Sequence, residues 1–425
     1  MLVGPRLRVY APRLFRTGYP MVSSDGSDPG SAAGYGASAA AVDGRRDIIL
    51  AYRDRLIPRS ELHFLRRLYV GFERLRPLWV GRSRDDGLAD LGDEAVFLGR
   101  EGVLGTWDRE MFKHFGVLPP VPDLRASRPR LVHAHFGRGG ALALPIARAL
   151  KIPLVVSFYG ADATKDKQYR KRFPPSVFQR RLHAMWDEAA LFLCVSGFIK
   201  EQLLARGFPP EKLLVQHSGV NIDPDYGPDD PAAPLYVMFA GRFVEKKGVP
   251  SLIEAVRRLE AEGRTVRLVL VGEGPMEQEL RQAASALKQV EFMGWMPNHE
   301  LRRWMRGALA LCVPSQRASD GDAEGLPTVV IEAMAAGTPV IGSRHAGIGE
   351  AVEDGETGFL IPEQDPDALA AALRRLMDEP NLRRALGENA RQAAMENFEM
   401  SAQSRRLEQR LLGVIAATYT SGPTR

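Results

Sequence analysis

Cysteine is scarce in this sequence of 425 residues, and long apolar runs are missing from it. Its two cysteines, Cys194 and Cys312, lie in separate apolar runs, which argues against a disulfide framework and is typical of a reducing compartment. No run of about eighteen uncharged apolar residues is present, so no segment is expected to span a membrane. Arginines interrupt the N-terminus before the apolar core of a secretory signal could form. We therefore expect a cytoplasmic protein.

Charge is unevenly distributed along the chain. Residues 1–181 contain 31 Lys and Arg against 18 Asp and Glu, whereas residues 182–425 contain 26 against 34. A basic first half suits an acidic membrane surface, a lipid diphosphate or nucleic acid. Neither an aromatic-basic platform for single strands nor a helix-turn-helix pattern is present, so we do not expect a nucleic-acid partner. A peripheral position at the inner face of the plasma membrane remains open.

The length exceeds what one hydrophobic core usually supports, so two domains are expected. A segment rich in Pro, Asp and Gly at 224–234 reads as a linker. We therefore predict a first domain at 1–223, a second at 235–399 and a terminal helix at 400–425. Short apolar runs that alternate with helical patterns favour parallel α/β sheets in both domains.

The stretch from Asp322 to Pro339 carries the most informative pattern. Pro327 can open a helix and Gly337 can end it, with apolar strand-like runs on both sides. Glu324 then lies at the carboxyl end of a strand, the edge where open α/β sheets bind ligands, and Glu332 lies eight residues later inside the helix. Amides at a helix start suit a phosphate, and ionised carboxylates accept hydrogen bonds from sugar hydroxyls. The stretch predicts a nucleotide-sugar site.

Two cations follow the apolar run that opens the second domain. Arg242 and Lys247 come shortly after Tyr236–Ala240 and would sit at the end of a strand. Such a pair can neutralise a diphosphate as it leaves, arginine as a bidentate fork and lysine as a point charge. A surface turn with unrelated charges is the alternative. Lys246 has the weaker claim to the same role.

The segment Ser60–Arg76 is predicted to be helical. Apolar residues recur there at helical spacing, Ser60 can cap its start, and Pro77 follows its end. Arginines occupy the remaining faces. Two interpretations are open: a helix packed on the sheet with a solvated basic face, which we favour, or a helix that lies on a membrane surface.

The central stretch resembles the Glu-x7-Glu signature of the retaining glycosyltransferases of family 4, the glycosyl transferases group 1, and continues into the same Ala-Met-Ala-Ala-Gly-Thr-Pro-Val run. The preceding Ser319–Gly325 is similar to exopolysaccharide members of the colanic-acid type. The resemblance covers residues 130–415 well and the first 130 residues loosely. It implies a GT-B fold, in which two Rossmann-like α/β domains face each other across a cleft and the terminal helix folds back on the first domain.

The same resemblance assigns site residues. It implies that Arg242 and Lys247 hold the donor diphosphate, that Glu324 contacts the sugar and that Glu332 contacts the ribose. With Glu324, these two cations are the catalytic candidates. Further donor contacts are expected at Gly325, Leu326, Pro327, Glu273 and Met293.

On the acceptor or sugar side the resemblance indicates His135, Tyr159 and Asp162. Tyr159 stands where most members carry histidine, which puts that contact in question. For His135, a purely structural role is as open as a direct role in the active site.

The function implied is transfer of a hexose from a UDP- or GDP-sugar to an acceptor hydroxyl with retention, in exopolysaccharide or other envelope glycan synthesis. The acceptor would be a glycan or a lipid-linked glycan. No metal or other cofactor is expected, because cations and a helix start would stabilise the diphosphate; Asp320-Gly-Asp322 is interpreted as loop structure. One alternative is a nucleotide-sugar epimerase of the same layout, which would convert the sugar without any acceptor. A catalytically inactive scaffold of a polysaccharide assembly complex is the other alternative.

Overall fold

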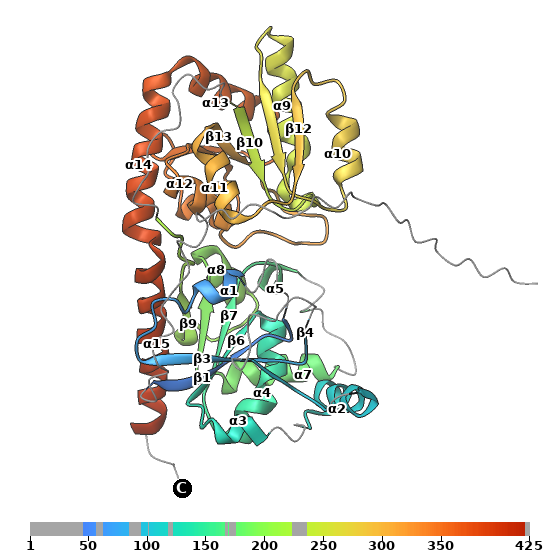
Figure 1. The fold of residues 1–425 in the computed structure, drawn as a ribbon, viewed down its shortest axis with the longest axis vertical. Helices are drawn as coiled ribbons and strands as arrows, with labels where there is room; N and C mark the ends of the chain where they lie inside the picture. The colour runs from blue at the N-terminus through green and yellow to red at the C-terminus, as the bar shows by residue number, and fades with distance from the viewer. Residues whose placement is uncertain are drawn as a thin grey trace, which may run out of the picture. The chain divides into compact units, whose positions relative to one another are not determined.

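A computed structural model describes residues 46–56, 63–84, 95–100, 102–117, 122–165, 169, 176–222 and 236–420. Two parallel sheets organise this part of the chain, and helices pack on both faces of each (Figure 1). The predicted linker at 224–234 lies outside the described residues, as do the first 45 residues of the predicted first domain.

The first sheet has seven strands among the described residues, in the order β5-β3-β1-β6-β7-β8-β9, and all pair in parallel. The central strands read as continuous apolar runs because helices bury both of their faces. The strands are β1 Asp47–Tyr52, β3 Leu75–Gly81, β5 Ala95–Phe97, β6 Leu131–His135, β7 Leu154–Phe158, β8 Leu191–Cys194 and β9 Leu213–Val215. A small pair, β2 Arg55–Leu56 and β4 Ser83–Arg84, lies outside this sheet. The helices and the 3-10 turn are α1 His63–Arg67, α2 Gly102–Phe115, α3 Pro122–Ala126, α4 Gly137–Leu150, α5 Ala161–Thr164, α7 Val177–Glu188, α8 Gly197–Ala205 and η3 Pro210–Lys212.

The second sheet has six strands in the described residues, in the order β12-β11-β10-β13-β14-β15, again all parallel. Its strands are β10 Tyr236–Ala240, β11 Arg267–Val271, β12 Val290–Gly294, β13 Ala308–Val313, β14 Val340–Ser343 and β15 Gly358–Ile361. Its helices and turns are η4 Glu245–Lys247, α9 Val249–Ala261, α10 Glu277–Ala283, α11 Asn298–Arg306, α12 Thr328–Ala335, η5 Ala346–Glu350, α13 Pro366–Asp378 and α14 Pro380–Phe398. The central helix was predicted to open at Pro327, and α12 begins directly after that residue.

Strand order reverses once in each sheet. In the second sheet, β10 pairs with β11 on one side and with β13 on the other. Ligands of open α/β sheets bind outside the carboxyl ends of the strands at such a reversal. The chain that follows β10 and the chain that follows β13 are therefore the segments in which a site is expected.

The predicted helix at Ser60–Arg76 is wrong beyond its first part. α1 ends at Arg67, a turn follows, and Leu75–Gly81 form strand β3 with Pro77 inside it. Proline is tolerated there because, in the part of the chain that the structure describes, β5 pairs only with Trp79–Gly81 and no strand pairs with Pro77 on that side. Leu65, Tyr69 and Phe72 are buried in the core, which contradicts the membrane-surface alternative for this segment.

The last described helix, α15 Met400–Thr420, lies along the first sheet (dark red in Figure 1). Leu407, Leu411 and Ile415 share a buried cluster with residues of β1 and β3. The buried carboxylate of Glu408 accepts hydrogen bonds from the backbone N–H groups of residues 73, 74 and 75, at 2.7–3.1 Å. None of the helices in the described ranges combines the length and apolarity that crossing a membrane requires.

Candidate active site

The turn after β10 carries the two predicted cations. Arg242 is exposed, and nothing in the described part of the chain pairs with its side chain. Lys247 ends the 3-10 turn η4, and Gly248 follows with a φ of 63°. A Cβ at Gly248 would lie 1.8 Å from the carbonyl oxygen of Pro314, so only glycine fits. This close approach holds the η4 turn against the chain that leaves β13.

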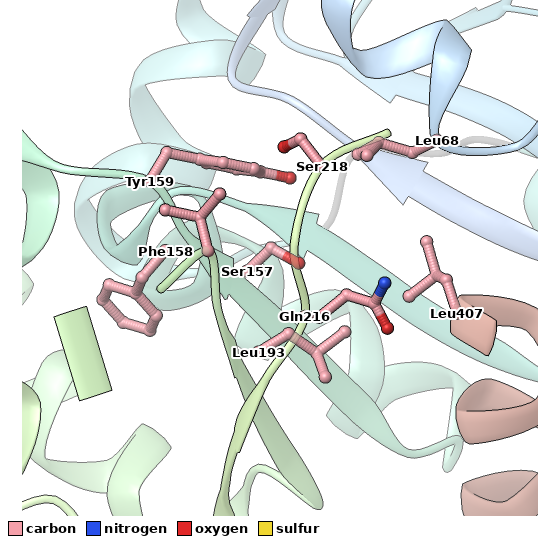
Figure 2. A pocket seen from close by; sticks show the side chains of 9 residues that line it. Leu68, Ser157, Phe158, Tyr159, Leu193, Gln216, Ser218 and Leu407 are labelled. Atoms are coloured by element: carbon pink, nitrogen blue, oxygen red, sulfur yellow. The ribbon is translucent and has the colours of Figure 1, made fainter. Parts of the chain in front are cut away.

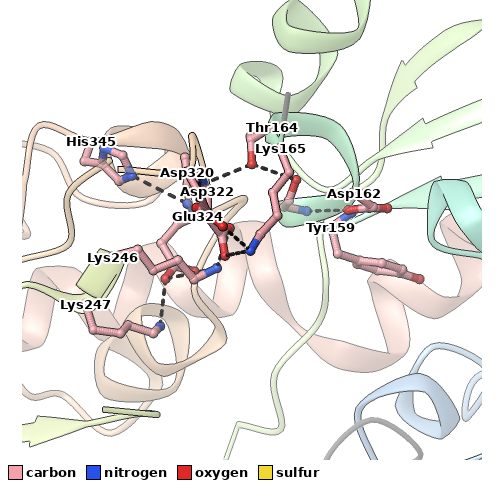
Figure 3. Close-up of polar contacts among 12 residues, drawn as sticks. Tyr159, Asp162, Thr164, Lys165, Lys246, Lys247, Asp320, Asp322, Glu324 and His345 are labelled. Atoms are coloured by element: carbon pink, nitrogen blue, oxygen red, sulfur yellow. Dashed lines mark hydrogen bonds and ion pairs between the residues drawn. The ribbon is translucent and has the colours of Figure 1, made fainter. Parts of the chain in front are cut away.

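Lys247 meets Glu324 at the reversal point. Its Nζ lies 3.0 Å from Glu324 Oε1 as an ion pair, and Lys246 Nζ lies 3.7 Å from the same oxygen and 3.1 Å from Asp322 Oδ1 (Figure 3). Glu324 is buried, and burial alone would raise its pKa. The charges of Lys247 and Lys246 together outweigh that effect and leave the pKa of Glu324 below its ordinary value. Glu324 is therefore an ionised acceptor at neutral pH.

The loop before Glu324 is bonded to residues at the end of α5, a helix that packs by the first sheet. Lys165, directly after α5, places its Nζ 2.7 Å from Asp320 and 3.3 Å from Asp322. The backbone N–H of Ala323 donates to Thr164 Oγ1 at 3.1 Å. Both aspartates of the Asp-Gly-Asp sequence are thus ion-paired within a turn. Among the described residues, no three His, Cys, Asp or Glu side chains gather into a set that would hold a metal ion.

Glu332 lies on α12 and is almost fully buried. Its Oε1 accepts from Arg67 Nη1 at 3.1 Å and from Asn298 Nδ2 at 2.9 Å. Within the described ranges its second carboxylate oxygen has no partner. An ionised carboxylate with one oxygen fixed and the other available can accept hydrogen bonds from a diol such as ribose.

Gly325 is the point of closest approach between the Glu324 loop and the acceptor-side candidates. A Cβ on Gly325 would lie 2.1 Å from the carbonyl oxygen of Tyr159. The Gly325 carbonyl accepts from Gly347 N–H at 2.8 Å and from Ser196 Oγ at 3.3 Å. The structure therefore brings Glu324, Lys247 and Tyr159 into one neighbourhood.

Asp162 organises the start of α5 rather than facing outward. Its Oδ1 accepts from the backbone N–H groups of Tyr159 and Gly160, at 3.1 and 2.9 Å, and its Oδ2 accepts from Gly137 N–H at 3.1 Å. Burial raises the pKa of Asp162 while these amides oppose the rise. The side chain fixes the ends of β6 and β7 relative to each other.

His135 lies beneath the site in a buried chain of hydrogen bonds. Its Nε2 is 2.8 Å from Tyr69 Oη and its Nδ1 is 2.8 Å from Tyr159 Oη. His133 continues the chain, with its Nδ1 at Tyr69 Oη and its Nε2 at Ser157 Oγ, both at 2.8 Å. Burial lowers the pKa of His133 to about 3 and the pKa of His135 well below its ordinary value, so both rings are neutral. Tyr159, at the position where the resemblance led us to expect histidine, thus anchors His135.

A small cavity lies beside this chain (Figure 2). Its volume is about 10 Å³, and Tyr159, Gln216 and Ser218 are among its lining residues. Gln216 Oε1 and Ser218 Oγ are buried in the described structure without a hydrogen-bond partner. The space suits about one water molecule and is too small for a sugar, so we do not assign it to a substrate.

The other donor candidates occupy neighbouring strand ends. Glu273 is exposed after β11, with its Oε1 3.4 Å from Trp295 N. Met293 is partly exposed on β12. Leu326 is buried and Pro327 directly precedes α12, so any ligand contact from Leu326 would come from its backbone.

Sequence reasoning missed several partners at the site. Arg67, Asn298 and Thr164 were not singled out, and Lys165 was not paired with the Asp320 loop. Arg67 and Glu332 are 265 residues apart, and Lys165 and Asp320 are 155 apart. Nothing in the local spacing of residues indicates pairs at such separations.

Comparisons with known proteins identify the family. Residues 229–393 match the model of glycosyl transferases group 1, and residues 102–224 match that of glycosyltransferase family 4. One relative, from Salmonella typhimurium, is named as a colanic acid biosynthesis glycosyltransferase. It is 32% identical to this chain over 283 residues, which cover 64% of this chain and 68% of the relative. The chain belongs to glycosyltransferase family 4. This confirms the family predicted from the Glu-x7-Glu stretch.

A second relative of this family 4 glycosyltransferase is an amylovoran biosynthesis glycosyltransferase of Erwinia amylovora. The two are 36% identical over 255 residues, which cover 57% of this chain and 60% of the relative. The chain thus spans less than two thirds of this relative's length.

Solved structures confirm the GT-B fold of this family 4 glycosyltransferase. Sucrose-phosphate synthase from Thermosynechococcus elongatus superposes with a TM-score of 0.69 at 22% identity, covering 88% of this chain and all of that one. An Anabaena protein in complex with UDP and glucose superposes with a TM-score of 0.69 at 18% identity, covering 87% and 100%. Identities this low support the fold alone.

Proposed function

We propose that the protein transfers a sugar from a nucleotide-sugar, a UDP- or GDP-sugar, to an acceptor hydroxyl with retention at the anomeric carbon. The observation that carries the proposal is the meeting of Lys247 and Glu324 where strand order reverses. Arg242 lies at the same strand end without a partner among the described residues, and α12 starts directly after the Glu324 loop. Cations, a helix start and buried carboxylates at one strand edge suit an anion that carries sugar hydroxyls.

The diphosphate would be held by Arg242, Lys247 and the free amides between Glu324 and α12. Lys247 pairs with Glu324 in this structure, and it would share its charge with the incoming diphosphate. As the sugar leaves, negative charge grows on the diphosphate, and preorganised cations lower the energy of that state. This arrangement needs no metal ion for charge neutralisation. Activity that persists in a chelator is the expected result.

The two carboxylates would bind the two sugars of the donor, the transferred hexose and the ribose. Glu324 would accept hydrogen bonds from hydroxyls of the transferred hexose, and its lowered pKa keeps it ionised for that task. Glu332 would accept from the ribose hydroxyls through the oxygen that Arg67 and Asn298 leave available. Glu273 and Met293 would lie near the base.

The acceptor is proposed to be a growing exopolysaccharide or another envelope glycan, carried on a lipid diphosphate. The relatives named for colanic acid and amylovoran biosynthesis support this class. Tyr159 is the acceptor-side candidate best placed for it, because its backbone touches Gly325 and its side chain is not fully buried. His135 and Asp162 would act by positioning the strand ends beneath it.

The test is transfer and slow hydrolysis with a panel of UDP-, GDP- and ADP-sugars. We expect one donor to be selected and its turnover to fall about 10²–10³-fold in Lys247→Met, the loss typical for one preorganised charge-stabilising group. Glu332→Gln should chiefly raise the donor concentration needed for half-maximal turnover. Glu291→Gln, which breaks only a surface pair with Arg267, is the matched control.

Three results would count against the proposal. Isomerised donor without any acceptor would indicate an epimerase. No binding of any donor would indicate a scaffold, and a product of inverted anomeric configuration in the proton NMR spectrum would contradict retention.

A further inference from the structure

Glu350 connects the second sheet's part of the chain to helix α8 of the first. It ends the turn η5; its Oε2 accepts from the Gly197 N–H at 2.7 Å and its Oε1 accepts from the Phe198 N–H at 2.9 Å. The first N–H groups of an α-helix have no partner within the helix, and the helix dipole favours an anion beside them. Glu350 therefore binds the start of α8 through two charge-assisted hydrogen bonds.

Helix α8 does not depend on this contact to begin where it does. Ser196 is its N-cap residue, and the Ser196 Oγ accepts from the Ile199 N–H at 3.3 Å. Glu350 is exposed, so water can take its place at the Gly197 and Phe198 amides. A carboxylate at this position thus adds little to the stability of α8. Its two short bonds instead fix the position of η5 relative to α8.

The middle of η5 contacts the loop that carries Glu324. The Gly347 N–H donates to the Gly325 carbonyl oxygen at 2.8 Å, and the Ser196 hydroxyl donates to the same oxygen at 3.3 Å. A Cβ at Gly347 would lie 2.4 Å from that oxygen, so the turn packs against the loop with no room for a side chain. Gly325 directly follows Glu324, and a shift of η5 would therefore move the Glu324 carboxylate.

The start of η5 contacts the same loop one residue earlier. His345, the N-cap residue of the turn, is buried, and its Nδ1 lies 2.7 Å from Glu363 Oε1. Its Nε2 lies 3.5 Å from the backbone nitrogen of Glu324 (Figure 3). With the Nδ1 proton directed at Glu363, Nε2 is left to accept from the Glu324 N–H. The turn therefore bonds to two successive residues of the loop, and Glu350 bonds the same turn to α8.

We propose that Glu350 is a positioning residue for sugar transfer: bound to the start of α8, it fixes η5 and, through that turn, the loop that carries Glu324. The role rests on the function proposed above, in which Glu324 contacts the transferred hexose. Glu332, the ribose candidate, lies on α12 and is held by Arg67 and Asn298 instead. Loss of the Glu350 carboxylate should therefore lower turnover and leave the affinity for the nucleotide unchanged.

The first test separates turnover from nucleotide binding. In Glu350→Ala we expect turnover with the selected donor to fall by about ten- to hundredfold, because a Glu324 carboxylate displaced by about 1 Å is no longer in the reacting geometry. The affinity for the corresponding nucleoside diphosphate, measured by calorimetric titration, should match that of the wild type. Glu350→Gln keeps one acceptor oxygen at the α8 amides, so its turnover should fall between those of Glu350→Ala and the wild type.

Glu353→Ala is the matched control for this test. Glu353 is an exposed carboxylate three residues further along the chain, and its replacement should leave turnover at the wild-type value. Urea midpoints of all four proteins should agree; if Glu350→Ala folds poorly, Glu350→Gln takes its place in the comparison. Turnover like that of the wild type in the Glu350 variants, or turnover and nucleotide affinity that fall together, would overturn the proposal.

A second measurement reports on the loop without requiring catalysis. Hydrogen exchange followed by mass spectrometry measures how often the amides of residues 323–326 open, and we expect their exchange to quicken about tenfold in Glu350→Ala. In Glu353→Ala the exchange should stay at the wild-type rate. Unchanged exchange in Glu350→Ala would overturn the positioning role. Quicker exchange, together with a wild type that transfers no sugar, would support the positioning of the loop and contradict the proposed function alone.

Discussion

Arg67 Nη1 lies 3.1 Å from Glu332 Oε1, so a residue that precedes β3 of the first sheet reaches the central helix that follows β13 of the second. The arginine is about one quarter exposed and the carboxylate is nearly buried. The carboxylate expected to hold the donor's ribose is thus oriented by a side chain from the other half of the described chain. We therefore expect donor binding to be coupled, at this pair, to the contact between segments of the two sheets.

Replacing Arg67 with alanine should weaken donor binding. Glu332 would keep only Asn298 as a partner, and its carboxylate would be less well oriented toward the ribose. We expect an affinity loss of about three- to tenfold, in the range of a partly exposed charged contact. Calorimetric titration with the selected nucleotide measures it. Arg66→Ala, an exposed neighbour, should change nothing; tighter binding by Arg67→Ala would instead show that the arginine competes with the donor.

Gly325→Ala should damage activity more than stability alone explains. The new Cβ would meet the Tyr159 carbonyl at 2.1 Å and Val195 at 2.5 Å, so the loop that carries Glu324 must move. Overpacking of this kind costs about 1–3 kcal/mol of unfolding free energy. The displaced carboxylate should lower turnover by about a hundredfold. Gly413→Ala on α15, where nothing lies within 4 Å of the added carbon, is the control. Turnover like that of the wild type in Gly325→Ala would contradict the assigned role of the loop.

Stability should fall as the pH drops below about 6.5, the ordinary pKa of histidine. His133 and His135 are neutral in the fold, with the pKa of His133 lowered by burial to about 3 and that of His135 lowered in the same direction. The unfolded chain then binds more protons than the fold, so each histidine removes up to about 1.4 kcal/mol per pH unit below that point. Denaturation midpoints from pH 7 to pH 5 measure the slope.

The control for that slope compares two substitutions. His133→Gln should flatten the pH dependence, whereas His299→Gln, at an exposed site, should leave it unchanged. An unchanged slope in His133→Gln would show that the buried histidine does not determine the acid sensitivity.

Glu408→Ala should destabilise the fold by about 2–4 kcal/mol. The change leaves three backbone N–H groups around residue 74 without their acceptor and detaches α15 from the segment that enters β3. The midpoint of urea unfolding followed by circular dichroism gives the loss. Gln409→Ala, on the exposed side of the same helix, should shift the midpoint little. Equal midpoints for the two variants would mean that water replaces the carboxylate without cost.

Local patterns sufficed for part of this fold. Helix α9, Val249–Ala261, is defined by local signals: Gly248 directly before it, a proline in its first turn and an apolar stripe along it. The Glu324 loop and α12 were predictable for the same reason. The Ser60–Arg76 error arose because Leu75 of β3 continues the helical spacing of the preceding residues by coincidence, and only pairing with β1 selects the strand.

Partners of the site residues could not be predicted in the same way. The ion pair of Lys247 and Glu324 joins the segments that follow β10 and β13, and only the sheet topology brings these segments together. Arg67 with Glu332 and Lys165 with Asp320 depend on how segments from different sheets meet.

The most direct test of the account is a titration of three ligands against three proteins. The ligands are the selected nucleoside diphosphate, its monophosphate and its 2′,3′-dideoxy analogue; the proteins are the wild type, Lys247→Met and Glu332→Gln. We predict that Lys247→Met loses about tenfold more affinity for the diphosphate than for the monophosphate. We also predict that Glu332→Gln loses affinity for both ribonucleotides but not for the dideoxy analogue. Equal losses across all three ligands, or none, would contradict the assignment of Lys247 to the diphosphate and Glu332 to the ribose.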